Sequence, residues 1–137
     1  MKLNKTFWRL LLVVYLITVC YLCFWNFQPS TSIPWSIWGI PTDKIVHFLM
    51  FLPAAPLFYL SLPEKWLPNV WVKLALLVAT ALAGAAVAAF TELGQAFTAY
   101  RTSDITDFWF DCYSVGGATV ITMLCVVIYE IHTRRNK

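Results

Sequence analysis

Four long apolar segments constrain this chain more than any other feature of its sequence. They lie at about residues 7–27, 44–62, 71–97 and 106–131. Because a helix rises about 1.5 Å per residue, each segment is long enough to cross a hydrocarbon layer of about 30 Å. A chain of 137 residues that is 60% hydrophobic and 12% charged cannot hide these segments in a soluble core. We therefore predict one all-α domain over residues 1–137, a polytopic membrane protein built as a four-transmembrane-helix bundle.

The distribution of Lys and Arg predicts the orientation of this bundle. With four crossings, both chain ends and the turn at residues 63–70 share one side of the membrane. Lys and Arg gather on that side, as they do on the cytoplasmic side of membrane proteins, so we expect both termini to be cytoplasmic. Their scatter over short tails and turns argues against nucleic-acid binding. These basic residues are Lys2, Lys5, Arg9, Lys65, Lys73, Arg134, Arg135 and Lys137.

Polar side chains gather at the other ends of the apolar segments. Charge close to the membrane interior is costly and usually has a function. Because chain direction alternates between crossings, the start of the second segment, the end of the third and the start of the fourth must share one membrane face. We expect one outward-facing charged pocket there. Its residues are Asp43, Lys44, His47, Glu92, Gln95, Arg101, Asp104, Asp107 and Asp111.

Small residues continue the polar faces of the third and fourth segments. Both faces change from charged to small at helical spacing, and small residues let helices approach closely. We therefore expect these two segments to pack on each other. In the second segment, Pro53 and Pro56 predict a bend whose freed carbonyl groups are satisfied by neighbouring helices. The two faces are Gly84, Ala88, Glu92 and Gln95 in the third segment, and Asp107, Asp111, Ser114, Ala118 and Thr122 in the fourth.

The acids of the predicted pocket outnumber its cations. Glu92 lies in the last turns of its helix, where the helix dipole disfavours an anion by about 0.3 to 1 kcal/mol. We expect Arg101 to be its partner through a bidentate contact, with Lys44 as the second candidate. Because five acids face two cations, at least one carboxyl group should be protonated, hydrated or bound to a cation.

The sequence assigns no metal site and identifies no cofactor. If a metal is present, the oxygen-rich set favours Mg²⁺ or Ca²⁺ over Zn²⁺, because His132 lies on the opposite side and leaves His47 as the histidine near the acids. Two interpretations of His47 stay open. It is either a structural histidine near a helix start or a functional one that shares a helix face with Asp43, four residues earlier.

Two further features have mainly structural interpretations. The loop over residues 29–43 is rich in Pro and aromatic residues, and either anchors at the membrane interface or forms a lid over the pocket. The four cysteines are surrounded by bulky apolar residues, so we expect buried free thiols. A metal or redox role for the CxxC spacing of the first pair is disfavoured, because the pair lies within an apolar helix. The cysteines are Cys20, Cys23, Cys112 and Cys125.

Two spaced patterns give the chain a resemblance to a known family. The first is Asp43-Lys44-x-x-His47-Phe48, and the second is Glu92-x-x-Gln95-x-Phe97-x-x-x-Arg101-x-x-Asp104-x-x-Asp107. Together they resemble the VanZ-like family of small bacterial membrane proteins, which is named for glycopeptide (teicoplanin) resistance. The resemblance covers the second to fourth segments. It implies a multi-pass protein of the bacterial inner (cytoplasmic) membrane that acts on or with the cell envelope.

The chain departs from the family after the second pattern. The family usually continues with Asn four residues after the last Asp, and with Gly three and seven residues beyond that Asn. Here these positions hold Asp111, Ser114 and Ala118. Small side chains are retained, but an acid replaces the amide, so a role that needs a neutral donor at this position does not carry over.

Two hypotheses about function follow from the pocket and the resemblance. In the first, the pocket binds or processes a lipid-linked or peptidoglycan-related envelope component, and hydrolysis or group transfer is compatible with its acids and bases. In the second, the polar cluster is structural, and the protein is a non-catalytic scaffold or accessory for envelope proteins. A transporter is disfavoured, because the cytoplasmic half lacks polar residues. The candidate catalytic residues are Glu92, Asp107, Asp111 and His47, and the candidate ligand-binding residues are Asp43, Lys44, Gln95, Arg101 and Asp104.

Overall fold

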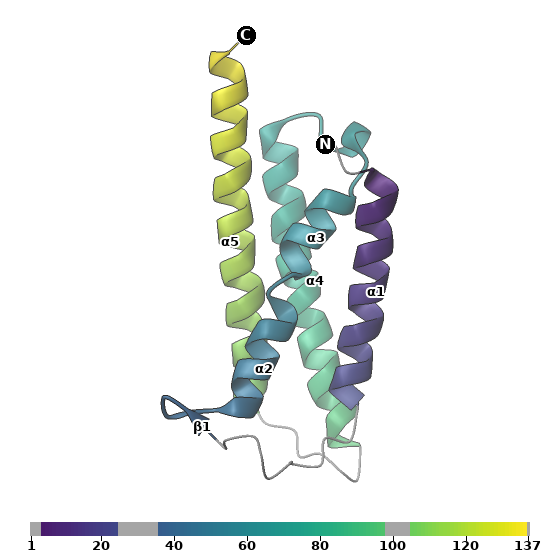
Figure 1. The fold of residues 1–137 in the computed structure, drawn as a ribbon, viewed down its shortest axis with the longest axis vertical. Coiled ribbons are helices and arrows are strands. Elements are labelled where there is room, and N and C mark those ends of the chain that lie inside the picture. The colour runs from purple at the N-terminus through teal and green to yellow at the C-terminus, as the bar shows by residue number, and fades with distance from the viewer. Residues whose placement is uncertain (1–3, 25–35, 98–104, 137) are drawn as a thin grey trace.

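The computed structural model describes residues 4–24, 36–97 and 105–136. Two predicted site residues, Arg101 and Asp104, lie outside these ranges. The elements, in chain order, are α1 (Lys5–Phe24), β1 (Ser36–Ile37), β2 (Ile40–Pro41), α2 (Thr42–Phe51), α3 (Ala54–Ser61), the 3-10 helix η1 (Glu64–Trp66), α4 (Val70–Ala96) and α5 (Ile105–Arg135) (Figure 1).

Four helical spans are long and apolar enough to cross a membrane: α1, the pair α2 and α3, α4, and α5. They confirm the four apolar segments predicted from the sequence. The second span begins at Thr42, two residues before the predicted start, and α5 continues to Arg135, four residues past the predicted end. The extension of α5 contains His132, Arg134 and Arg135 in its last turn, where cations interact favourably with the helix dipole.

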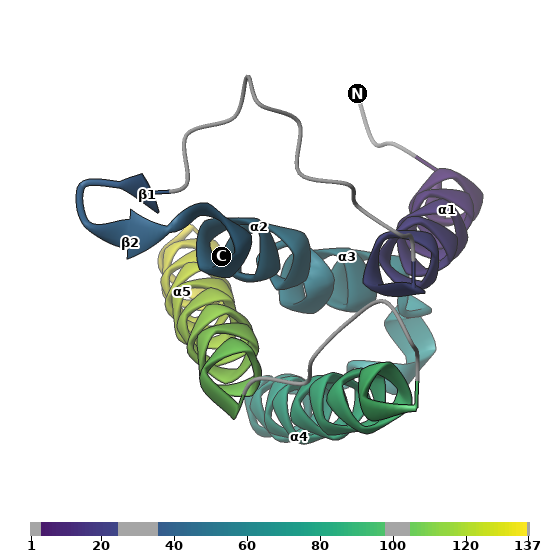
Figure 2. The ribbon, with the colours of Figure 1, turned by 90° about the horizontal axis from the view of Figure 1, so that it is seen from below.

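The spans run alternately in opposite directions (Figure 1). The start of α2, the end of α4 and the start of α5 lie together, and we call this the polar end. The first turn of α1 and the last turn of α5 lie at the opposite end, which we call the terminal end. Seen along the bundle, α2 and α3 lie between α1 and α5, while α4 packs mainly on α5 (Figure 2). Alternation of direction therefore gathers the three predicted pocket segments.

The second span is broken between α2 and α3, as Pro53 and Pro56 predict. Proline lacks a backbone N–H, and its ring clashes with the preceding turn. Neighbouring helices donate to carbonyl groups near the break. Tyr15 Oη of α1 donates to the Met50 carbonyl at 2.9 Å, and the Ser114 hydroxyl of α5 donates to the Phe48 carbonyl. These two hydrogen bonds, one from α1 and one from α5, thus stabilise the bend.

The small faces of α4 and α5 pack on each other, as predicted. Ala88 is fully buried, and Ala118 is 5% exposed. At Gly84 an added Cβ would lie 2.9 Å from Cγ1 of Val115, closer than carbon atoms approach in van der Waals contact. The absence of a side chain at this position therefore lets the two longest helices come together, and their charged ends meet as a consequence.

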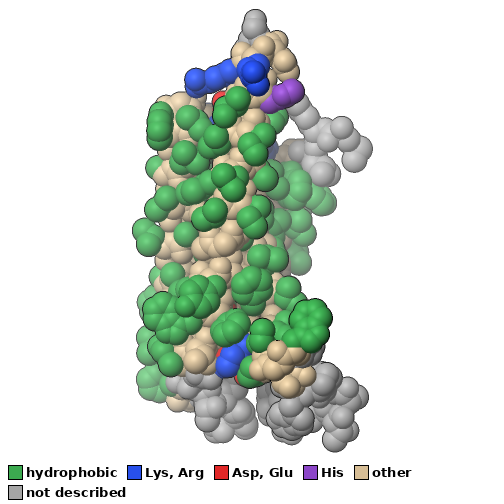
Figure 3. Space-filling view, turned by 90° about the vertical axis from the view of Figure 1, so that its left-hand side faces the viewer, with side chains coloured by type: hydrophobic (Ala, Val, Ile, Leu, Met, Phe, Trp, Pro, Cys, Tyr) green, Lys and Arg blue, Asp and Glu red, His purple; other side chains and the backbone are tan. Residues whose placement is uncertain are grey.

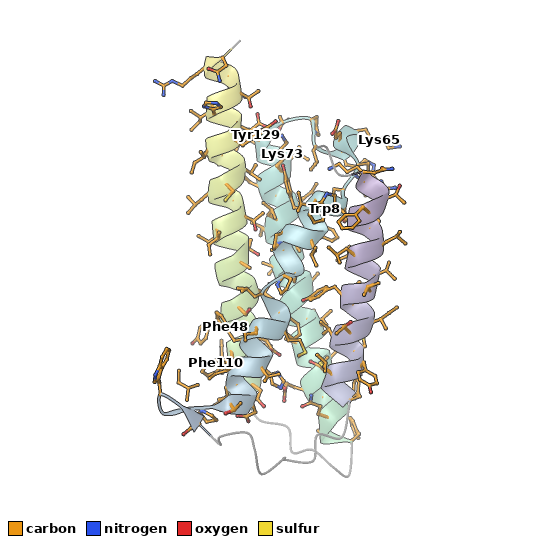
Figure 4. All side chains as sticks on the ribbon, viewed as in Figure 1. Trp8, Phe48, Lys65, Lys73, Phe110 and Tyr129 are labelled. Atoms are coloured by element: carbon orange, nitrogen blue, oxygen red, sulfur yellow. The ribbon has the colours of Figure 1, made fainter. Side chains whose placement is uncertain are left out.

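Basic side chains tie the helices together at the terminal end. Lys5 Nζ donates to the Leu60 carbonyl and Arg9 Nε to the Ser61 carbonyl, each at 3.2 Å. These carbonyls belong to the last turn of α3, whose carbonyl groups lack partners within the helix. Lys73 at the start of α4 forms an ion pair with Glu130 of α5, and Figure 4 places Lys73 close to the α5 segment that carries Tyr129.

The outer surface of the bundle is largely apolar. On the face drawn in Figure 3, hydrophobic side chains extend along most of the length, while Lys and Arg appear near the two ends. The expectation of buried thiols is wrong for Cys20 and Cys125, which are exposed, and Cys112 is half-buried; Cys23 alone of the four is buried. All four are free. Apolar neighbours do not predict burial here, because a membrane helix turns apolar residues toward lipid as readily as toward protein.

A short hairpin precedes α2. Strands β1 and β2 pair antiparallel, with Ile37 opposite Ile40. The two turn residues, Trp38 and Gly39, have φ of 53° and 80°, as a type I′ turn requires. The hairpin projects sideways from the polar end (Figure 1), and Trp38 is 98% exposed. Anchor and lid both remain predictions for this loop, and the projecting Trp38 supports the anchor.

Candidate functional site

The polar end brings together side chains from α2, α4 and α5. On α2, Lys44 and His47 are three residues apart, and on α5, Asp107 and Asp111 are four apart, so each pair occupies one face of its helix. The two faces are turned toward each other. Glu92, in the last turns of α4, completes the group. We call Lys44, His47, Glu92, Asp107 and Asp111 the polar cluster.

His47 and Asp111 form the most deeply buried contact of the cluster. Nδ1 of His47 lies 3.1 Å from Oδ1 of Asp111 and 3.4 Å from its Oδ2. The two side chains are 5% and 0% exposed. Because a carboxylate accepts hydrogen bonds, Nδ1 acts as the donor. A buried carboxyl group needs such a partner, since losing the hydrogen bonds of water is costly. Asp111 lies beyond the first turn of α5, so helix capping does not explain its position.

Lys44 and Asp107 form a charged pair next to this contact. Nζ of Lys44 lies 2.8 Å from Oδ1 of Asp107, and the side chains are 13% and 10% exposed. Asp107 also benefits from its place in the first turn of α5, where the helix dipole favours an anion. Its other oxygen, Oδ2, lies 3.8 Å from Nε2 of His47. The imidazole is therefore flanked by one carboxyl group on each side.

Glu92 brings α4 into the cluster. It is 8% exposed, although it carries a carboxyl group in an apolar helix. One of its carboxyl oxygens lies within 4.8 Å of a ring nitrogen of His47 and of a carboxyl oxygen of Asp111. Three helices thus contribute one ligand-type atom each to a single small volume. This juxtaposition is the arrangement that the alternation of helix direction predicts.

An open cavity on the lipid-facing surface shares one residue with the cluster. It measures about 320 Å³ and lies between α4 and α5. Its walls are apolar apart from Glu92, and two of its residues, Leu93 and Ile105, are 60% and 68% exposed. Glu92 therefore belongs both to the polar cluster and to the cavity. The lining residues are Ala89, Glu92, Leu93, Ile105 and Phe108.

The cluster contains the groups for several kinds of polar chemistry. An imidazole between two carboxyl groups can accept and pass on a proton. Carboxylates accept hydrogen bonds from hydroxyl groups and ligate cations. The ammonium of Lys44 can hold an anionic group as a point charge. These properties permit binding and acid–base chemistry, and they do not select one reaction.

The other predicted site residues lie in different places. Gln95 is 2% exposed, and its Nε2 donates to the Cys23 carbonyl at 3.0 Å, so its amide joins α4 to the last turn of α1. Asp43 has a side chain 60% exposed, 4.0 Å from Lys44 Nζ. The carboxyl partners of His47 therefore come from α5 rather than from Asp43. The expected pairing of Glu92 with Arg101 falls outside the described residues.

Sequence reasoning missed two contributors to this region. Ser114 was expected only as a small residue, yet its hydroxyl fastens α5 to the backbone of α2. Its position three residues after Asp111 placed it on the polar face, which was the available signal. Phe108 was missed as a wall of the cavity. Its orientation depends on how α4 and α5 pack, and a sequence pattern does not give that rotation.

Comparison with known proteins agrees with this architecture. No curated protein and no solved structure gave a match. A family model described as VanZ/LLP1 matches residues 12–129, which is most of the chain and includes all five residues of the polar cluster. The resemblance noted from the two spaced patterns is thereby confirmed. The chain belongs to the VanZ/LLP1 family, and its four apolar helices make it a multi-pass membrane protein.

Proposed function

We propose that the polar cluster is an outward-facing site that binds or processes a lipid-linked component of the bacterial cell envelope. One observation carries the proposal: Glu92 lies both in the cluster and in the wall of the apolar cavity between α4 and α5. A molecule with a hydrocarbon part and a polar head would fit both. The hydrocarbon part would enter the cavity from the bilayer, and the polar head would meet the cluster.

The residues of the cluster suit such a head group. Carboxylates accept hydrogen bonds from sugar hydroxyl groups. Lys44 can hold a phosphate, as can Arg101, which lies between α4 and α5 in the sequence. If a reaction follows binding, the His47 and Asp111 pair provides the acid and base, with Glu92 and Asp107 as further candidates. Asp43, Gln95 and Asp104 remain candidate ligand-binding residues.

The distribution of charge supports an extracytoplasmic position for the site. The terminal end carries Lys5, Arg9, Lys65, Arg134 and Arg135, and such enrichment is typical of the cytoplasmic side. The polar end then faces outward from the inner membrane, where lipid-linked envelope precursors are consumed. Both chain ends are cytoplasmic in this orientation.

Binding to a lipid-linked saccharide precursor in nanodiscs tests the proposal. We expect saturable binding by the parent chain and at least a tenfold loss in Glu92→Gln and Asp107→Asn, with melting temperatures within a few degrees of the parent. Glu64→Gln is the matched control, because it removes a carboxylate from an exposed position at the terminal end. Unchanged binding in both site variants would refute the proposal.

A structural role is the alternative, and the hydrogen bonds of the cluster favour it. The contacts of Lys44 with Asp107 and of His47 with Asp111 join α2 to α5, and Gln95 joins α4 to α1. A scaffold or accessory for envelope proteins would need these contacts only for folding. In that case Asp107→Asn lowers abundance and melting temperature together, and no ligand restores them.

Glycopeptide resistance provides a test in cells. We expect a bacterium that expresses the chain to tolerate more teicoplanin than the same strain without it. Asp107→Asn, at equal abundance in the membrane, should lose this effect if the cluster is a working site. Full protection by an equally abundant Asp107→Asn chain would favour the scaffold alternative.

A further inference from the structure

We propose that His47, Glu92 and Asp111 form a binding site for a divalent transition-metal ion. The three residues come from α2, α4 and α5, and one potential ligand atom of each lies within 4.8 Å of the others. They are 4%, 8% and 0% exposed. Metal ligands about 2.1 Å from one ion lie roughly 3 to 4 Å from one another, so a closure of at most about 2 Å completes this set.

Charge within the cluster favours a bound cation. The carboxyl groups of Glu92 and Asp111 come from different helices, converge beside His47, and are both buried. Carboxylates brought together in a buried site repel each other, which is costly. A divalent cation supplies two positive charges at the point where Glu92 and Asp111 converge.

The surroundings of His47 resemble the outer shell of a metal site. A metal-bound histidine usually presents its other ring nitrogen to a carboxylate, which fixes the orientation of the ring. Here Nδ1 faces Asp111, and Nε2 lies 3.8 Å from Oδ2 of Asp107. For an ion to bind Nδ1, the proton that Nδ1 donates to Asp111 in the metal-free chain must leave, and the ring then carries its proton on Nε2, toward Asp107. Asp107 is in turn held by Lys44 at 2.8 Å. The ligand atoms and their support are therefore both present before any ion binds.

The ligand types indicate which ions fit. Carboxylates alone would suit Mg²⁺ or Ca²⁺, the ions expected from the sequence, but a ring nitrogen in the set shifts the preference toward transition-metal ions such as Zn²⁺. Mn²⁺ also fits, because it accepts carboxylate ligands together with a ring nitrogen. The three protein ligands leave further coordination positions for water or for an oxygen of a bound molecule. Because Glu92 also lines the apolar cavity, such a molecule would reach the ion from the bilayer.

Titration of the metal-stripped protein with Mn²⁺ tests this inference. The full chain is purified in nanodiscs, treated with EDTA and desalted, and free Mn²⁺ is followed by electron paramagnetic resonance. We expect about one tightly bound ion per chain, and a rise in melting temperature as Mn²⁺ is added, since a ligand of the folded state stabilises it. Mg²⁺ at equal concentration should not displace Mn²⁺.

Variants assign the site. Glu92→Gln and His47→Gln should lose Mn²⁺ binding. Asp107→Asn, which changes the carboxyl group beside His47 and leaves the three ligands in place, should weaken it about 10- to 100-fold. Glu64→Gln, at the terminal end, should bind as the parent does. Melting curves without metal show which variants are folded, and only folded variants are compared. No Mn²⁺ binding by the parent, or parent-like binding by folded Glu92→Gln, overturns the inference.

The inference rests on the cluster and does not require the proposed lipid. Different experimental results would therefore refute the metal site and the proposed function. Lipid binding that persists in EDTA, with no Mn²⁺ bound by the parent, removes the metal site and leaves the proposed function. Mn²⁺ binding by a parent chain whose lipid binding is unchanged in Glu92→Gln and Asp107→Asn removes the proposed function and leaves the metal site.

Discussion

Asp111 is the residue whose position most needs an explanation. Its side chain is completely buried in a helix that is apolar enough to cross a membrane. The His47 ring nitrogen at 3.1 Å provides a hydrogen-bond donor. Removing one member of a buried pair costs more than the pair is worth, because the other member keeps its desolvation cost without its partner. Asp111 and His47 should therefore respond to substitution as a unit.

Substitution of Asp111 tests this dependence. Asp111→Ala should lower stability by about 1 to 3 kcal/mol, because Nδ1 of His47 loses its acceptor. Asp111→Asn should cost less, since its amide oxygen still accepts from Nδ1. Asp43→Ala, which alters a side chain that is 60% exposed, should have the same melting temperature as the parent. Thermal melting in detergent measures the three changes, and an Asp111→Ala chain that melts like the parent contradicts the argument.

At the scale of elements, the contact between α4 and α5 depends on residue size. Gly84 gives Val115 the room that a Cβ would occupy. On the same pair of helices, Gly117 has no atom within 4 Å of an added Cβ. Two helical glycines in one protein therefore have different roles: Gly84 allows close packing, while Gly117 only loses the helix propensity that alanine would bring.

Paired glycine substitutions measure this difference. Gly84→Leu should destabilise the bundle by about 1 to 3 kcal/mol through overpacking. Val115→Ala in the same chain should recover part of the loss, because it removes the atoms that clash. Gly117→Ala should be neutral or stabilise by up to about 1 kcal/mol. Equal effects of Gly84→Leu and Gly117→Leu in melting experiments would show that packing at Gly84 is unimportant.

The hydrogen bond from Tyr15 of α1 to the backbone near the break between α2 and α3 gives a second prediction about how the helices are held together. Tyr15→Phe removes the donor to the Met50 carbonyl, and interhelical hydrogen bonds in membranes contribute about 0.6 kcal/mol on average. We expect a loss of that size in the melting experiment. Tyr113→Phe, at a side chain 64% exposed, is the control. Equal losses in both variants would mean that the bond has no measurable effect.

For the whole molecule, the testable claim is the orientation across the membrane. In a chain whose four cysteines are replaced by alanine, Asp43→Cys at the polar end should react with a membrane-impermeant maleimide in intact spheroplasts. Glu64→Cys at the terminal end should react only after permeabilisation. Both positions are exposed, so access to the reagent depends on the side of the membrane. Labelling of Glu64→Cys in intact spheroplasts would reverse the predicted orientation.

The sequence predicted the lengths and directions of the helices better than the pairing of their side chains. Segment length and alternation of direction place His47, Glu92 and Asp111 at one end of the bundle, and the structure agrees. The rotation of each helix is set by packing, and the pattern gives it only approximately. For that reason Asp43, which shares a helical spacing with His47, is exposed, and Lys44 contacts Asp107 rather than Glu92.

The hydrogen bond between Ser114 and the Phe48 carbonyl has a consequence for biosynthesis. Its two residues are 66 positions apart. At about 5 to 20 residues per second, the ribosome needs roughly 3 to 13 s to make the intervening chain. During that interval the nascent second span carries His47, Lys44 and a proline-interrupted backbone without their α5 partners. The translocation machinery or interfacial water must therefore shelter this span until the last helix has been synthesised.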